Sequence, residues 1–246
     1  MEFLCNKNLL ISKKLKQTQL ENGGFAWFKG GPDNRYITQY IVTGIGHLKK
    51  LGIDIKRLDP ILRMAMPYID KQIQKDYDEL KKNKTDLTKY TAGYYQVQYL
   101  YMRSFFSEQK IPSASQEAYN FFRSRIQQTW MKQNKYMQGM IALALFKTND
   151  SKTPGAILKS LKETSTNNEE LGMYWKENSG GWFWHQAHIE TQSLLIEAFS
   201  EINKDARTID DLKIWLLKNK QTSSWETTKA TAEACYALLL QETNLL

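Results

Sequence analysis

The side chains best suited to chemistry stand in one short stretch, His185-x-x-His188-x-Glu190. Histidine nitrogens and carboxylate oxygens are zinc ligands, so this stretch has the ingredients of a metal site. A helical histidine pair that binds zinc usually has a spacing of four residues, as in HExxH, whereas this pair has a spacing of three. We therefore predict neither a metal site nor a bound cofactor.

Paired carboxylates offer a second chemistry. Glycosidases use two carboxyl groups that flank the scissile bond, and Glu190 and Glu226 are the candidates here. The sequence does not fix the distance between them, so a carbohydrate-active enzyme remains an alternative. The chain has no Gly-x-Ser-x-Gly turn, phosphate-binding loop, dinucleotide fingerprint or aspartate-rich cyclase motif. The sequence predicts no catalytic residue and a protein that is not an enzyme.

These residues belong to a pattern that occurs three times: a turn of small residues, a tryptophan, a polar first helical turn and a buried helix. The three copies begin at Gly23 (GGFAWFKGGPDNRYITQYIVTGIGHL), Gly180 (GGWFWHQAHIETQSLLIEAFS) and Ser223 (SSWETTKATAEACYALLL). On one interpretation the tryptophans are wedges and the polar residues cap helices. On the other, they line a surface that contacts a ligand or peptide. The candidates for this surface are Trp27, Arg35, Trp182, Trp184, His185, His188, Glu190, Trp225 and Glu226.

The hydrophobic periodicity predicts helices that alternate in character, with no strand and a polar loop over residues 165–170. One-sided helices are expected at residues 7–20, 59–82 (with Pro67 kinking or restarting the helix), 113–133, 155–164 and 209–217. Helices buried on most faces are expected at residues 35–51, 88–106, 135–147, 189–202 and 228–240. In a helical hairpin, a one-sided helix can lie outside, facing water, while a helix buried on most faces lies inside. A ring of such hairpins is an α/α toroid. A linear solenoid also fits, but no repeat of about 34 or 40 residues is visible.

The composition is that of a globular protein. With 246 residues, the chain fits one large domain or two small ones. The net charge of +8 comes from scattered lysines, so we predict a solvated surface and no nucleic-acid partner. Two cysteines, Cys5 and Cys235, are too few for a disulfide framework. There is no signal sequence or long apolar run, and Met1 leads directly into domain-like sequence. We expect one toroid domain over residues 1–246, cut from a larger protein and lacking its first hairpin.

Three blocks carry a family resemblance: GGFAWFKGGPDNRYITQYIVTGIGHL, ETQSLLIEAFSEI and DDLKIWLLKNKQTSSWETTKATAEACYALLL. They resemble the thioester-containing, complement-like domain of bacterial alpha-2-macroglobulins, in the large Bacteroides-type forms. The resemblance implies an α/α toroid of five to six hairpins within a peptidase inhibitor of the periplasm or cell envelope. Such a protein traps proteases after bait cleavage, so the implied partners are proteases and the other domains of the parent protein. Any membrane attachment would come from an anchor outside this chain.

The chain departs from that family at the thioester. In the family, a cysteine and a glutamine within Cys-x-Glu-Gln form the thioester, whereas Cys5 is followed by Asn6, Lys7 and Asn8. No thioester is expected in this chain, and no catalytic residue is carried over. A plain protein-interaction scaffold is the remaining alternative.

Overall fold

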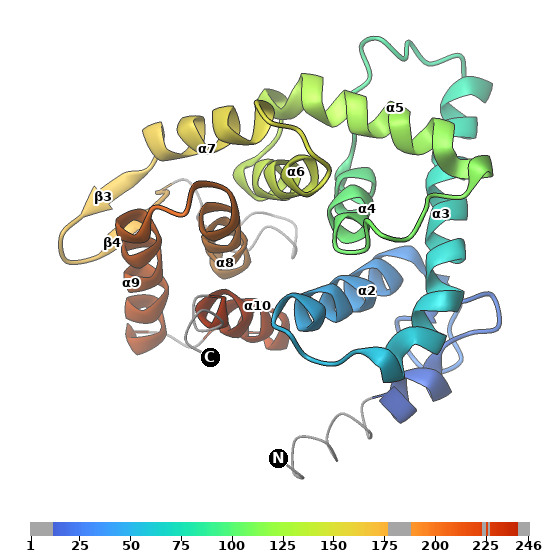
Figure 1. Cartoon of the computed structure of the whole chain (residues 1–246), viewed down its shortest axis with the longest axis horizontal. Helices are drawn as coiled ribbons and strands as arrows, with labels where there is room; N and C mark the ends of the chain where they lie inside the picture. The colour runs from blue at the N-terminus through green and yellow to red at the C-terminus, as the bar shows by residue number, and fades with distance from the viewer. Residues whose placement is uncertain (1–11, 177–187, 223–224, 226, 241–246) are drawn as a thin grey trace. The chain divides into compact units, whose positions relative to one another are not determined.

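The computed structural model describes residues 12–176, 188–222, 225 and 227–240, without the side chains of residues 221 and 222. Most of these residues are helical, which confirms the all-α class (Figure 1). The chain divides into two compact units, Met1–Ile126 (unit 1) and Gln127–Leu246 (unit 2). The single toroid remains a prediction.

Unit 1 is built on three helices that pack against one another. Its α3 lies beside both α2 and α4, and α2 lies against α4 (Figure 1). A short helical segment at residues 12–18 and a two-stranded hairpin precede them. The elements are β1 (Phe25–Ala26), β2 (Asp33–Asn34), α2 (Arg35–Lys50), the 3-10 turn η1 (Lys56–Leu58), α3 (Asp59–Lys82), α4 (Tyr94–Ser104) and α5 (Ser113–Thr129).

The ends of α2 follow from its sequence. Asn34 is extended, and its side chain accepts a hydrogen bond from the backbone N of Ile37, which satisfies a free N–H of the first turn. Gly52 has a φ of +74°, a conformation that glycine adopts without strain just after a helix. Gly46 brings α2 close to α4, because a Cβ there would lie 2.6 Å from Cγ of Phe105. The predicted range of 35–51 is therefore confirmed to within one residue.

Two helices of unit 1 differ from prediction in their extent. The structure shows α3 as one helix that continues through Pro67, so of the two alternatives, a kink or a restart at Pro67, the restart is wrong. Pro67 is exposed, and it removes one N–H from the helix ladder while the flanking turns remain helical. The helix predicted from residue 88 begins only at Tyr94, after Gly93 at the N-cap. Its deep burial is as predicted, with Val97, Tyr99 and Met102 inaccessible.

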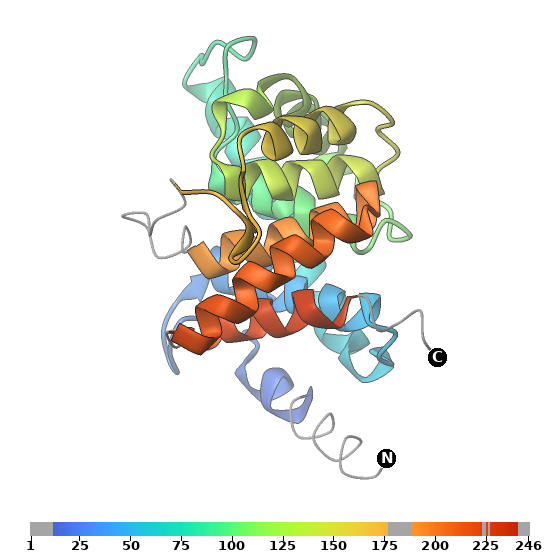
Figure 2. The same ribbon diagram turned by 90° about the vertical axis from the view of Figure 1, so that its left-hand side faces the viewer.

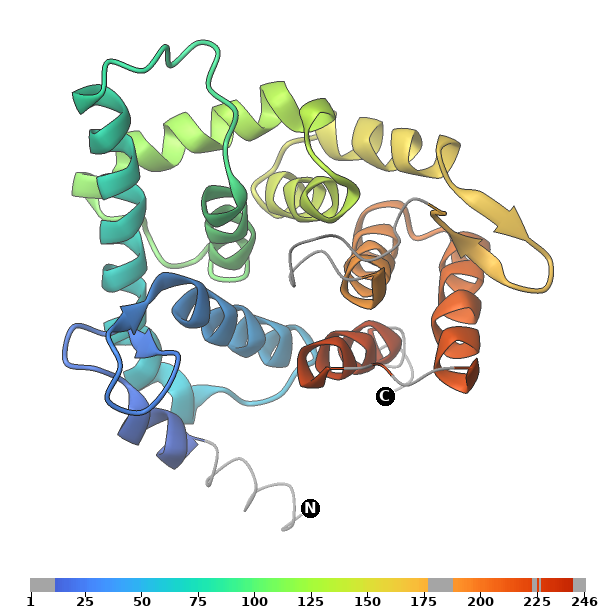
Figure 3. The ribbon, with the colours of Figure 1, turned by 180° about the vertical axis from the view of Figure 1, so that it is seen from behind.

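Unit 2 places α8 at its centre. Figures 1 and 3 both show α8 between α6 and α10, while α7 packs on α6 and α9 on α8. Ten of the eleven residues of α8 and nine of the thirteen of α6 are buried, against four of the eleven of α7. The predicted alternation is thus present from α6 to α8, whereas the last helix, predicted to be buried on most faces, has only four of its twelve residues buried. Its elements are the 3-10 turn η2 (Trp130–Lys132), α6 (Lys135–Lys147), α7 (Thr153–Glu163), β3 (Thr166–Asn168), β4 (Gly172–Tyr174), α8 (His188–Ala198), the π-helical turn η3 (Phe199–Asn203), α9 (Ala206–Thr222) and α10 (Thr228–Leu239).

A β-hairpin stands where the sequence predicts a polar loop. Thr166 pairs with Tyr174 and Asn168 with Gly172 in antiparallel register, and β4 packs on α9 (Figure 2). Gly172 has a φ of +76°, and a Cβ there would overlap the backbone oxygen of Asp211 in α9. The hairpin therefore depends on a glycine that lets two backbones touch. The expectation of no strand is wrong at this point and at β1–β2.

Among the helices that the structure describes, none combines the length and apolar character needed to cross a membrane.

Candidate functional site

The candidate contact surface of unit 1 begins at Trp27, between the two strands of the β1–β2 hairpin. Trp27 is 60% exposed, and its ring centroid lies 6.3 Å from that of Tyr36. Tyr36 lies 6.1 Å from Tyr94, which lies 5.9 Å from Tyr95. We call these four residues the aromatic chain. Tyr95 is 47% exposed, so the aromatic chain is accessible at both ends.

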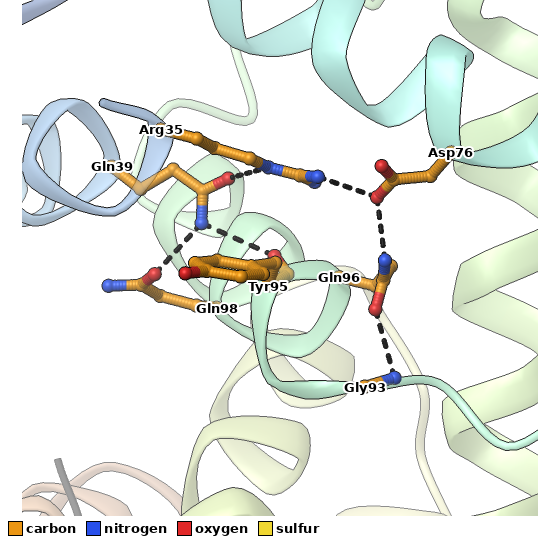
Figure 4. A network of polar contacts seen from close by, with 7 residues as sticks. All are labelled: Arg35, Gln39, Asp76, Gly93, Tyr95, Gln96 and Gln98. Atoms are coloured by element: carbon orange, nitrogen blue, oxygen red, sulfur yellow. Dashed lines mark hydrogen bonds and ion pairs between the residues drawn. The ribbon is translucent and has the colours of Figure 1, made fainter. Parts of the chain in front are cut away.

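Arg35, the second predicted residue of this surface, is held flat over Tyr95 (Figure 4). Its Nε donates to Oε1 of Gln39 at 2.8 Å, and its Nη1 lies 2.6 Å from Oδ2 of Asp76. The guanidinium carbon is 5.5 Å from the centre of the Tyr95 ring. Its Nη2 is buried and has no hydrogen-bond partner among the residues that the structure describes. This nitrogen is therefore shielded from solvent, and the guanidinium is held by Gln39 and Asp76.

Two glutamines of α4 form hydrogen bonds with the residues around Arg35 (Figure 4). Nε2 of Gln96 donates to the same Oδ2 of Asp76 at 2.6 Å, while its Oε1 accepts from the backbone N of Gly93 at 2.9 Å. Nε2 of Gln39 donates to Oε1 of Gln98 at 2.9 Å. The network joins α2, α3 and α4, and it supplies Asp76 with donors from within the unit.

A pocket of about 280 Å³ opens beside this network, along α3. Oη of Tyr68 donates to Oδ2 of Asp33 at 2.6 Å, and Nδ2 of Asn22 donates to Oδ1 at 3.1 Å. The hydrogen bond from Tyr68 lowers the pKa of Asp33, so this carboxylate stays ionised with both oxygens engaged. Burial, together with the neighbouring Asp33, raises the pKa of Tyr68. The lining also includes Lys71, Gln72 and Lys75.

In unit 2, the predicted residues at the start of α8 and before α10 are placed in packed surroundings. His188 meets the ring of Trp215 edge-on, with centroids 6.0 Å apart. Glu190 is 2% exposed, and its Oε1 lies 3.6 Å from Nζ of Lys229. Trp225 is 8% exposed. Glu190 and Trp225 therefore contribute to packing, whatever else they do.

The other predicted residues, Trp182, Trp184, His185 and Glu226, lie outside the described residues. Trp27 and Arg35 belong to unit 1, whereas His188, Glu190 and Trp225 belong to unit 2. Their convergence at one mouth remains a prediction, as does the separation of the Glu190 and Glu226 carboxyl groups.

Unit 2 contains a set of charged side chains that the sequence motifs did not indicate, with three buried glutamates and several partly exposed partners, which we call the glutamate cluster. Its carboxylates come from α8, η3 and α10 and its lysines from α6 and α10. Glu197 is 1% exposed and accepts hydrogen bonds from Nζ of Lys147 at 3.1 Å and from Oη of Tyr236 at 3.2 Å. The spacing of 190, 197 and 201 places three glutamates on one face of a helix, a signal the sequence contains. The cluster comprises Glu190, Glu197, Glu201, Glu233, Lys147, Lys229 and Tyr236.

One member of the cluster titrates near neutrality. The surrounding protein atoms desolvate the carboxyl group of Glu233 and raise its pKa to about 7, with the charges of Glu197 and Glu190 acting in the same direction. Lys229 opposes this shift. Within the described part of the chain, no three His, Cys, Asp or Glu side chains are arranged to hold a metal ion. The chemical property of the cluster is therefore a carboxyl group, that of Glu233, which binds a proton between packed helices near neutral pH.

No protein-family model matches the chain, and a search of curated proteins finds no match.

Proposed function

We propose that this chain is a non-catalytic helical domain of a macroglobulin-type protein that traps peptidases after bait cleavage, without a thioester of its own. Its partners are then the trapped peptidase and the other domains of the parent protein, at the periplasmic face of the cell envelope. The alternation of buried and one-sided helices supports an α/α toroid of five to six hairpins as the architecture. The proposal concerns recognition through surfaces, not turnover of a substrate.

The proposal is supported mainly by the contacts of the polar side chains in the first turns of α8. Nε2 of Gln192 donates to the backbone oxygens of Met173 at 2.8 Å and Leu212 at 3.0 Å. Glu190, two residues earlier, faces Lys229 of α10. A glycosidase would present such a carboxylate to its substrate. Here these side chains join α8 to its neighbours, while Trp27 and Tyr95 in unit 1 face solvent. This division of roles favours a contact domain over an enzyme.

The test uses the longest natural protein that contains this chain. The protein is mixed with a peptidase such as trypsin, and the mixture is separated by size-exclusion chromatography. We expect the peptidase to elute with the large protein, to cleave small peptide substrates and to lose activity on large protein substrates. Denaturing electrophoresis should show no covalent adduct that involves this chain, because it lacks Cys-x-Glu-Gln.

The matched control is a peptidase whose active-site serine has been blocked, so that it cannot cleave a bait. This peptidase should elute separately. Elution of the active peptidase in its free form, with full activity on large substrates, would contradict peptidase trapping. Hydrolysis of a glycan by the isolated chain, lost in Glu190→Gln, would favour the enzyme instead.

A further inference from the structure

Two neighbouring aromatic side chains of unit 1, Trp27 and Phe28, face solvent in the loop that joins β1 and β2. Trp27 is 60% exposed and Phe28 is 65% exposed, and Lys29, the next residue, is exposed as well. We call residues 27–29 the turn tip. Figures 1 and 3 both show the β1–β2 hairpin at the edge of unit 1, beside α3. Single exposed apolar residues are common on proteins, whereas two adjacent large rings mark a surface that contacts something apolar.

The local backbone holds both rings in place. The backbone N of Gly31 donates to the backbone oxygen of Phe28 at 3.0 Å, and Gly30 has a φ of +81°, which this kind of turn requires at its third residue. A Cβ at Gly31 would lie 3.1 Å from Cε2 of Phe28, so the Phe28 ring rests against this glycine. The ring of Trp27 is supported by Tyr36 of α2, with centroids 6.3 Å apart. Because the rings are already oriented, little conformational entropy is lost when they make a contact.

The turn tip lies outside the pocket beside the hairpin. That pocket is lined by Asn22 and Asp33, near the base of the hairpin, and by residues of α3, but not by Trp27 or Phe28. A folded partner needs a surface that is complementary in shape to the rings. A lipid bilayer needs none, because its headgroups and acyl chains move apart around an inserted side chain. Rings that are more than half exposed therefore suit a bilayer.

Unit 1 also carries the positive charge of the chain. It contains 21 lysines and arginines against 12 aspartates and glutamates, whereas unit 2 contains 13 against 14. Lys29 places one positive charge within the turn tip itself. At the base of the hairpin, Lys71 and Lys75 line the pocket together with Asp33, whose ionised carboxylate offsets one of these two charges. The surroundings of the hairpin are therefore positive, and lysines near a bilayer are attracted to anionic headgroups.

We infer that the turn tip docks unit 1 on the surface of an anionic lipid bilayer. Trp27, which has an apolar ring and an N–H donor, suits the headgroup region, where tryptophan is enriched. Phe28 has no polar atom in its side chain and suits the boundary with the acyl chains. Lys29 binds the anionic headgroups between them. The contact is peripheral and needs no spanning helix.

Charge distinguishes the bilayer from the other occupants that could cover two aromatic rings. A second copy of the chain would bring the same excess of positive charge to the interface, which opposes association. A single-stranded nucleic acid needs a basic groove that follows its backbone, whereas the pocket beside the hairpin contains the ionised Asp33. An anionic bilayer offers an apolar interior for the rings and negative charge for the lysines.

The experiment measures co-sedimentation of the full chain with lipid vesicles. Vesicles of phosphatidylcholine with about 40% phosphatidylglycerol are compared with vesicles of phosphatidylcholine alone. We expect at least about tenfold stronger partitioning to the anionic vesicles, because the lysines are attracted only there. Most of this difference should disappear as NaCl rises from about 100 to about 500 mM. An oligothymidylate of about ten nucleotides should not release the chain from the vesicles.

Matched variants localise the contact to the turn tip. Trp27→Ala/Phe28→Ala should weaken partitioning to the anionic vesicles by at least about tenfold, because the inserted apolar surface is lost. Ile53→Ala/Met64→Ala removes two other exposed apolar side chains of unit 1 and should change partitioning by less than about twofold.

Charge and position are tested in the same way. Lys29→Gln should weaken partitioning at least about threefold, whereas Lys82→Gln, at an exposed residue in the last turn of α3, should change it by less than about twofold. Lipids with brominated acyl chains quench the fluorescence of a tryptophan that is close to them. We expect quenching in the unmodified chain and none in Trp27→Phe, although this conservative variant should still bind.

Absence of partitioning, equal partitioning to the two kinds of vesicle, equal losses in the two apolar double variants, quenching that persists in Trp27→Phe, or release by the oligothymidylate would each overturn the inference. So would a dimer in size-exclusion chromatography that only Trp27→Ala/Phe28→Ala converts to a monomer, because a second copy would then cover the rings.

The inference goes beyond the proposed function, since it concerns unit 1 alone and does not require peptidase trapping. It adds a membrane contact within this chain to the anchor expected outside it. Vesicle binding is measured without a peptidase and peptidase retention without lipid, so the failure of one leaves the other in place.

Discussion

At the scale of single residues, the glutamate cluster sets four carboxylates against two lysines inside unit 2. Glutamate is rarely this buried unless it is paired, and Glu197 and Glu201 share the ammonium of Lys147. Glu190 faces Lys229, and the charge of Lys229 also acts on Glu233, whose pKa it lowers against the effect of burial. The pKa of Glu233 is raised mainly because the surrounding protein desolvates its carboxyl group, and the charges of Glu197 and Glu190 add to this shift.

The first prediction concerns Glu233→Gln. The folded pKa of about 7 lies above the model-peptide value of 4.5, so the folded state binds this proton more tightly. The stabilising effect of the proton is complete below about pH 4.5 and is lost as pH rises to about 7. Gln, which is neutral throughout, should therefore stabilise unit 2 at pH 8 by up to about 3 kcal/mol and have little effect at pH 5.

Urea unfolding followed by circular dichroism at both pH values measures this change. Glu169→Gln, at an exposed acid of the same unit, is the control and should show no such difference between pH 5 and pH 8. An equal effect of Glu233→Gln at the two pH values would mean that Glu233 is ionised throughout this range.

The second prediction concerns Asp205, which precedes α9. It accepts hydrogen bonds from Oγ1 of Thr208 at 2.6 Å and Nζ of Lys162 at 2.9 Å, which lower its pKa from 3.8 to about 2. Its contribution is present above about pH 4 and is lost as pH falls toward 2. Asp205→Asn should therefore lower the Tm at pH 6, with a smaller difference at pH 3. Asp210→Asn, exposed on the same helix, should show no such trend.

Residue types reveal the candidate site only in part. Trp27 and Arg35 could be singled out because a tryptophan after glycines and an arginine at a helix start are conspicuous. The surroundings of Arg35 depend on partners up to 41 residues away, such as Asp76. The burial of Glu197 could not be identified from its type, since an acid in an apolar helix normally marks its solvent face.

At the scale of elements, boundaries were predictable where local chemistry sets them. α2 and α6 each begin after an asparagine whose side chain accepts a hydrogen bond from the backbone N–H three residues later. For both helices the predicted range agrees with the structure to within one residue. The strand Thr166–Asn168 was not predictable, because its polar residues pair with β4 only after Gly172 brings that strand onto α9. The continuation of α3 through Pro67 likewise depends on burial of the flanking turns.

The third prediction tests the contact between β4 and α9. In Gly172→Ala, the new methyl group would overlap the backbone oxygen of Asp211, and the positive φ adds strain. We expect a loss of at least about 2 kcal/mol in the free energy of unfolding. Gly155→Ala, within α7 and with open space around the new Cβ, should instead stabilise by about 0.5–1 kcal/mol. Equal effects at the two positions would contradict the close approach of the backbones.

At the scale of the whole molecule, the alternation of helix types was predictable from periodicity, whereas closure into a ring was not. Periodicity reports how many faces of a helix are covered, but not which distant helix covers them. The residues predicted to share one mouth belong to two units, so the toroid and the single domain stay predictions.

The fourth prediction concerns coupling between the units. α5 runs without interruption across the boundary between Ile126 and Gln127, and Ile126 and Thr129 are both buried. Unfolding of unit 2 should therefore remove part of the support of α5. We expect Gly172→Ala to lower hydrogen-exchange protection in α2 and α4 as well as in α8. A loss confined to residues 127–240 would show that the two units unfold independently.

The proton held at Glu233 also has a thermal signature. Between about pH 5 and pH 7 the folded chain carries this proton and the unfolded chain does not, so unfolding delivers it to the buffer. The heat absorbed in a calorimeter then includes the enthalpy of buffer protonation. Scans in phosphate and in Tris, matched in pH and ionic strength, should give different apparent enthalpies for the same transition. The difference between the two enthalpies, divided by the difference in protonation enthalpy of the two buffers, gives the number of protons released on unfolding.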